Sequence, residues 1–127
     1  MEYQTIAHLP KETDDMVRAY LECAEWCGLS DEDHEALELA VSPVWSAESL
    51  RQAGEDCSCF LADHASVIGG RLSMAGHDFW LTRNRHGAGF WDGDWKTEDG
   101  RILTDSAHVW GEVNVEFDAD TETLSLV

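Results

Sequence analysis

The sequence predicts a single α+β domain across residues 1–127. An N-terminal three-helix half is expected to pack on a small, mainly antiparallel four-stranded sheet with one C-terminal helix. Apolar residues recur at helical spacing in the first 70 residues, and they alternate with polar residues, as in half-buried strands, in the remainder. A length of 127 residues is typical of one domain, and an apolar fraction of 43% is enough for a packed core.

Three helices are expected in the N-terminal half. The first begins near Thr13, where the acidic residues that follow favour the positive end of the helix dipole. Ser30 is a suitable cap for a short second helix, which ends before Pro43. A third helix is expected over about residues 46–65. Residues 1–10 are expected to form an extended arm or an edge strand.

The C-terminal half is organised around residues 76–92, which read Gly-His-Asp-Phe-Trp-Leu-Thr-Arg-Asn-Arg-His-Gly-Ala-Gly-Phe-Trp-Asp. Residues 78–82 alternate as in a half-buried strand, and residues 84–87 contain the Asn and Gly typical of a turn. The pattern predicts a β-hairpin that carries Trp80 and Trp91 on its two strands. We expect both indoles to lie in the core, whereas exposed indoles would mark an interface.

Three elements are expected after the hairpin. A short helix covers about residues 102–110 and ends at Gly111. Residues 113–118 alternate between apolar and polar or acidic side chains, which predicts a strand with one solvated acidic face. After a turn, residues 123–127 are expected to pair back on that strand.

Residues 76–92 resemble the signature Gly-His-Asp-Phe-Trp-Leu-Thr-Arg-Asn-Gly-His-Gly-Ala-Gly-Phe-Trp-Asp of a family of small proteins carried by bacteriophages and other mobile elements. The departure inside this run is Arg85, where the family usually has Gly. Weaker similarity extends over residues 20–24, 56–61, 103–107 and 111–126. The resemblance implies a phage or mobile-element setting and supplies no mechanism.

The most distinctive property of the whole sequence is its net charge of −18. Phosphate backbones repel such a protein, so direct binding to DNA or RNA is not expected, whereas basic surfaces attract it. The alternative is a housekeeping or virion module whose acidity reflects a salt-rich medium, which the presence of only two Lys residues also fits. Neither a long apolar run nor a signal peptide is evident, so we expect a cytoplasmic protein without a membrane partner.

A small metal-dependent or acid–base enzyme is the alternative to a binding protein. His77, Asp78 and His86, with Asp92 nearby, belong to the residue types that transfer protons or hold metals. Structural roles account for this run better, and Arg83 is expected to pair with a carboxylate. Because no catalytic motif occurs, we assign no catalytic residue, no metal and no cofactor.

Four cysteines form the pairs Cys23-x3-Cys27 and Cys57-x-Cys59. Two helices could bring them together as four zinc ligands, although only the first pair has a usual zinc spacing. Disulfides are rare in the cytosol. We therefore expect thiols that pack as small hydrophobic side chains.

The leading hypothesis is an acidic phage or mobile-element protein that inhibits a host defence complex, as an anti-CRISPR or anti-restriction factor that mimics DNA. Its partner would be the basic nucleic-acid-binding surface of that complex, in the host cytoplasm. Carboxylates spaced along one side of the protein would take the place of phosphates. The expected contact residues are Asp31, Glu32, Asp33, Glu35, Glu55 and Asp56.

Overall fold

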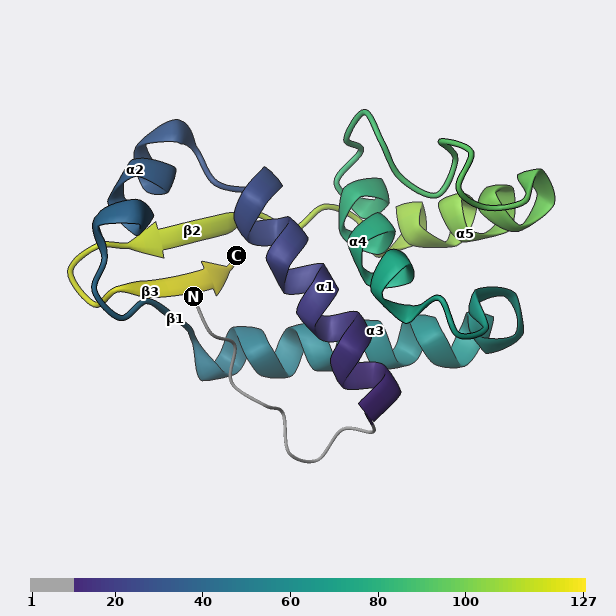
Figure 1. Cartoon of the computed structure of the whole chain (residues 1–127), viewed down its shortest axis with the longest axis horizontal. Helices are drawn as coiled ribbons and strands as arrows, with labels where there is room; N and C mark the ends of the chain where they lie inside the picture. Colours follow the sequence, from purple (N-terminus) through teal and green to yellow (C-terminus); the bar gives the residue numbers. More distant parts are fainter. Residues whose placement is uncertain (1–10) are drawn as a thin grey trace.

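The structure is a computed structural model that describes residues 11–127, with side chains from residue 13 onward. The extended arm or edge strand expected at residues 1–10 lies outside the described residues. In chain order the elements are α1 (Lys11–Cys27), α2 (Asp31–Leu39), β1 (Val44–Trp45), α3 (Ala47–Ile68), α4 (Leu72–Arg83), α5 (Thr97–Trp110), β2 (Val115–Asp118) and β3 (Thr123–Leu126) (Figure 1).

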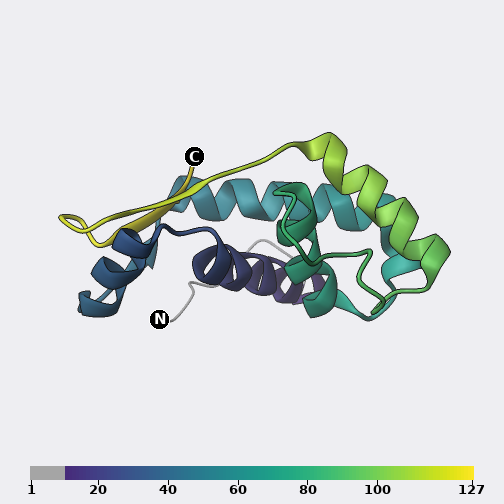
Figure 2. The same cartoon turned by 90° about the horizontal axis from the view of Figure 1, so that it is seen from above.

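The elements gather at two ends of an elongated molecule, with α2 and the sheet at one end and α4 and α5 at the other (Figure 1). Helix α3 runs along the long axis and links the two ends, as the view from above also shows (Figure 2). Helix α4 packs between α1 and α5. None of the helices within residues 11–127 combines the length and the apolar character needed to cross a membrane.

Local capping positions two of the helices where the sequence predicts them. The Ser30 hydroxyl accepts a hydrogen bond from the Asp33 amide at the start of α2, and the Ser46 hydroxyl accepts one from the Ser49 amide at the start of α3. Helix α5 begins at Thr97, earlier than expected, and Gly111 follows its last residue. Helices α2 and α3 therefore begin where their own sequences predict them.

The sheet has three strands in the order β1–β3–β2, so the expected mainly antiparallel four-stranded sheet is wrong. Strands β2 and β3 are antiparallel, as predicted, with Phe117 opposite Leu124. Strand β1 is parallel to β3 and places Trp45 beside the same Leu124. The class is α+β, but the molecule is mostly helical, with five helices and three strands in residues 11–127.

The predicted hairpin is wrong: its first half lies in helix α4 and its second half is a loop. Eight of the twelve residues of α4 are buried, so both sets of alternating residues in the run 78–82 face other parts of the protein. Phe79 stacks on Phe60 with ring centroids 4.2 Å apart, and Trp80 meets Tyr20 edge-on. A helix surrounded on nearly all sides shows no amphipathic period in its sequence.

The two indoles of the expected hairpin have different environments. Trp80 is buried, as predicted, whereas Trp91 is 54% exposed and the prediction for it is wrong. The glycines of the run allow close packing. A Cβ on Gly76 would collide with the Met16 carbonyl oxygen of α1, and one on Gly89 would collide with the Thr82 hydroxyl. Most of the run therefore builds the core.

Candidate functional site

The enzyme alternative centres on a groove of about 500 Å³ between α1, α4 and the loop that follows α4. His77, Asp78 and Asp92 line this groove, as do Cys23 and Cys27. His86 does not line it. The structure therefore brings together three of the four candidates that the sequence offered for acid–base chemistry.

Asp78 is the buried member of this group, and its surroundings give it a structural role. Its carboxylate accepts a 2.8 Å hydrogen bond from the Trp95 indole, and His77 Nδ1 lies 3.4 Å from its second oxygen. Burial raises the pKa of the Asp78 carboxyl above its ordinary value, while the hydrogen bonds from Trp95 and His77 oppose that rise. The carboxylate orders the loop around Trp95 at one wall of the groove.

The cysteines do not assemble into a zinc site. Cys23 and Cys27 lie on α1, whereas Cys57 and Cys59 lie on α3. Burial raises the pKa of the Cys23 and Cys57 thiols, which keeps them protonated at neutral pH. Within the described part of the chain, no three His, Cys, Asp or Glu side chains are grouped so that they could hold a metal ion.

Arg83 is buried in a network that ties α4 to three other parts of the molecule. Its guanidinium donates hydrogen bonds to Asp56 Oδ2 at 2.9 Å and to the Tyr20 hydroxyl at 3.0 Å. It also donates to the carbonyl oxygens of Trp110 and Gly111. The predicted pairing of Arg83 with a carboxylate is confirmed. Asp56 is consequently buried and ion-paired, which removes it from the expected contact surface.

The other five expected contact residues do not form one surface. Asp31, Glu32 and Glu35 are exposed on α2, whereas Glu55 lies on α3 in an ion pair with Arg51. The sheet lies between the two helices, because α2 packs on β2 and α3 packs on β3 (Figures 1 and 2).

Asp33 has a structural role. Its carboxylate accepts a hydrogen bond from the Phe117 amide and so caps the outer edge of β2.

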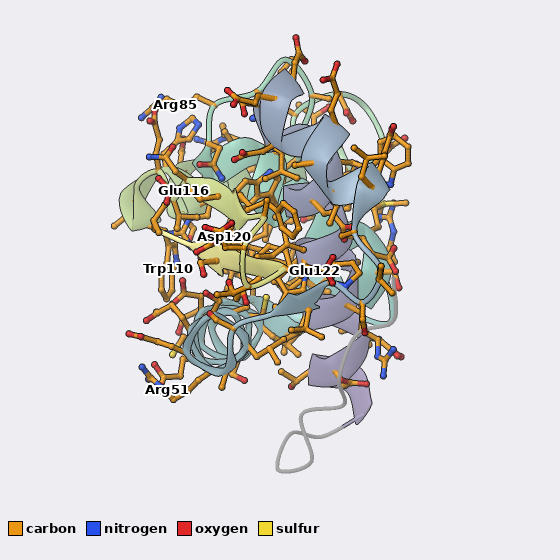
Figure 3. The ribbon with its side chains drawn as sticks, turned by 90° about the vertical axis from the view of Figure 1, so that its left-hand side faces the viewer. Arg51, Arg85, Trp110, Glu116, Asp120 and Glu122 are labelled. Atoms are coloured by element: carbon orange, nitrogen blue, oxygen red, sulfur yellow. The ribbon has the colours of Figure 1, made fainter. Side chains whose placement is uncertain are left out.

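Helix α2 is the least buried helix of the described chain, since none of its nine residues is buried. Polar contacts hold it and the loop after it in place. His34 Nε2 donates to the Trp26 carbonyl oxygen at 3.0 Å, and the Glu122 carboxylate accepts from the amides of Val41 and Ser42. These backbone hydrogen bonds lower the pKa of Glu122. Figure 3 faces this end of the molecule and labels Glu122, which lies in the turn between β2 and β3.

Sequence reasoning missed the exposed apolar residues at the end of α2 and beside it. Trp26 is 78% exposed, Leu39 is 84% exposed and Val41 is 94% exposed. A signal was present, because Leu37 and Leu39 are two positions apart and cannot share one helix face. One of them had to point away from the body of the protein.

The basic residues of the described chain are mostly engaged with neighbouring groups. Arg18, Arg51 and Arg101 each pair with an acidic residue three or four positions away, and Arg83 is buried. Exposed carboxylates therefore dominate the surface.

No protein-family model, curated protein or solved structure matches this chain.

Proposed function

We propose that this chain is a binding protein that occupies the basic nucleic-acid-binding surface of a host defence complex of the CRISPR or restriction type. The supporting observation is that Asp31, Glu32 and Glu35 are exposed on a helix that buries none of its residues. The phage setting rests on the resemblance of residues 76–92. The proposed place of action is the host cytoplasm.

The physical basis is electrostatic. Carboxylates on a protein with a net charge of −18 attract a basic groove over a distance of about one Debye length, ~8 Å at physiological salt. The three α2 carboxylates would take the place of phosphates inside that groove. Since α3 lies beyond the sheet, the proposed mimicry is confined to α2. Association should be fast and sensitive to salt.

The test begins with affinity capture of the defence complex from a host lysate and continues with a displacement assay. The captured complex is incubated with labelled duplex DNA and increasing amounts of this protein. We expect DNA binding to be lost as the protein is added, and the loss to weaken at higher salt. A complex that retains DNA at saturating protein would contradict the proposal.

Two variants of equal net charge assign the effect to α2. The first removes the three α2 charges through Asp31→Asn, Glu32→Gln and Glu35→Gln. The second removes three exposed charges elsewhere, through Asp63→Asn, Asp105→Asn and Glu112→Gln. We expect the α2 variant to inhibit DNA binding at least roughly tenfold less well, while the control inhibits nearly as wild type. Equal inhibition by the two variants would overturn the assignment to α2.

A further inference from the structure

A second feature of the α2 end is a groove of about 500 Å³ between the end of α1 and α2, lined by both apolar and polar side chains. Its walls include Trp26, Leu37 and Val41, and Glu25 and Glu38 stand among them. The high exposure of Trp26 and Val41 is informative because large apolar side chains normally bury most of their area. Within residues 13–127 the fold provides no cover for this surface.

The groove is held open by polar contacts. The His34 hydrogen bond to the Trp26 carbonyl oxygen fixes α2 against the last turn of α1, and the two rings lie 6.2 Å apart. On the other side the Glu122 carboxylate fixes the amides of Val41 and Ser42. The walls are therefore in place before any ligand arrives, which lowers the entropic cost of binding.

Charge selects among the possible occupants. A second copy of this chain is repelled, because each copy has a net charge of −18 and the groove carries Glu25 and Glu38. Nucleic acid is repelled too, because its phosphates are also negatively charged. A protein segment with cationic side chains is attracted, and an exposed indole such as Trp26 offers its face to a Lys or Arg.

We propose that the groove between Trp26 and α2 docks a segment of the protein partner in which a large apolar side chain is flanked by Lys or Arg. The apolar side chain enters between Trp26 and Val41, and the flanking cations meet the carboxylates of the groove and of α2. This inference rests on the proposed function, because it names how the basic partner is held. It adds that charge alone does not account for the contact.

Three short fluorescent peptides test the chemistry of the site by anisotropy. One alternates Lys with Leu, one alternates Lys with Ser, and one alternates Glu with Leu. We expect the Lys–Leu peptide to bind at least roughly tenfold more tightly than the Lys–Ser peptide, and the Glu–Leu peptide not to bind. Equal affinity for the two Lys peptides would overturn the inference, since the contact would then be purely electrostatic.

Two exposed tryptophans supply a matched pair of variants. Trp26→Ala should weaken binding of the Lys–Leu peptide by roughly 30-fold, as expected for an indole that becomes buried on binding. Trp91→Ala removes another exposed indole, which lies outside the groove, and should leave the affinity unchanged. Equal losses in both variants, or none in either, would contradict the inference.

The displacement assay separates this inference from the proposed function. Loss of DNA displacement with Trp26→Ala, but not with Trp91→Ala, supports both. Undiminished displacement by Trp26→Ala overturns the apolar docking site and leaves the proposed function standing. Failure of the wild-type protein to displace DNA, together with Trp26-dependent binding of the Lys–Leu peptide, overturns the proposed function and supports a docking site for a different basic partner.

Discussion

Helix α4 and helix α2 belong to the same acidic chain and use their side chains in opposite ways. Helix α4 buries eight of its twelve residues, including Asp78 and Arg83, whereas α2 buries none of its nine. The charged groups of α4 are satisfied inside the protein. Exposed carboxylates remain on α2, and apolar side chains beside it are uncovered.

The difference shows where to search for function. The run 76–92 is the most distinctive part of the sequence, yet contacts within the protein account for most of its residues. Helix α2 is distinctive only in the structure, because none of its nine residues is buried. Substitutions in α4 should therefore change stability, and substitutions around α2 should change binding.

The largest effect is expected for Trp80→Ala. Trp80 is fully packed against Tyr20, so truncation should destabilise the protein by about 3–5 kcal/mol, which urea denaturation measures. Trp26→Ala removes an exposed indole and should change stability by less than about 0.5 kcal/mol. Similar losses in the two variants would mean that α4 and the α2 end are not distinct in burial.

A loss of similar size is expected for Arg83→Met, because it leaves the Asp56 carboxylate buried without its cation. Breaking a buried pair in this way costs about 3–5 kcal/mol. Adding Asp56→Leu removes the unpaired charge, and the double variant should recover part of the loss in the same urea experiment. A double variant less stable than Arg83→Met would show that the unpaired carboxylate is not the source of the cost.

Gly76→Ala tests the close approach of α1 and α4. A methyl group at this position would collide with the Met16 carbonyl oxygen, and we expect a loss of about 1–3 kcal/mol. Gly87→Ala is the matched control, since no heavy atom lies within 4 Å of the added carbon. Thermal unfolding should separate the two variants. A Gly76→Ala protein that melts with the wild type would contradict this packing.

Arg85→Gly should stabilise the protein. Arg85 has a φ of +57°, a left-handed conformation that costs a residue with a Cβ about 1–2 kcal/mol of folding free energy. Glycine avoids this cost, but its greater conformational freedom in the unfolded chain offsets roughly half of the gain. We expect a net gain below about 1 kcal/mol. Arg85→Ala keeps the strained conformation and should show no gain.

The smallest effect concerns the pH dependence contributed by Asp78. Its pKa is raised by burial, so the folded state binds the proton more tightly than the unfolded state. This contribution to the free energy of unfolding is fully present at a pH below the pKa that Asp78 has in the unfolded chain. It is lost as the pH rises through the higher pKa that Asp78 has in the folded protein.

Asp78→Asn retains an acceptor for the Trp95 indole and removes the titration. Relative to this variant, the wild type should be more stable at about pH 3 than at about pH 7, as measured by urea denaturation. If the difference in unfolding free energy between the wild type and Asp78→Asn does not vary with pH, or varies in the opposite direction, the raised pKa of Asp78 is contradicted.

Local sequence determined the elements whose stabilising groups are close in the chain. Ser30 and Ser46 cap helices through amides three residues away, and the alternation in residues 115–118 places Val115 and Phe117 inward. These features depend on neighbouring residues and on periodicity, so they can be read without knowing what lies across the fold.

The tertiary structure decided the rest, because the groups involved meet only after folding. The sequence of helix α4 shows no helical period, since other parts of the protein surround the helix. The two-residue strand β1 forms because the Val44 amide donates to the carbonyl oxygen of Glu122, just before β3, and the Ser46 amide donates to that of Leu124 in β3. Asp56 and Glu55 are adjacent in sequence, yet only Asp56 meets a buried guanidinium. Burial of a charge depends on a partner distant in sequence, and neither composition nor spacing reveals that partner.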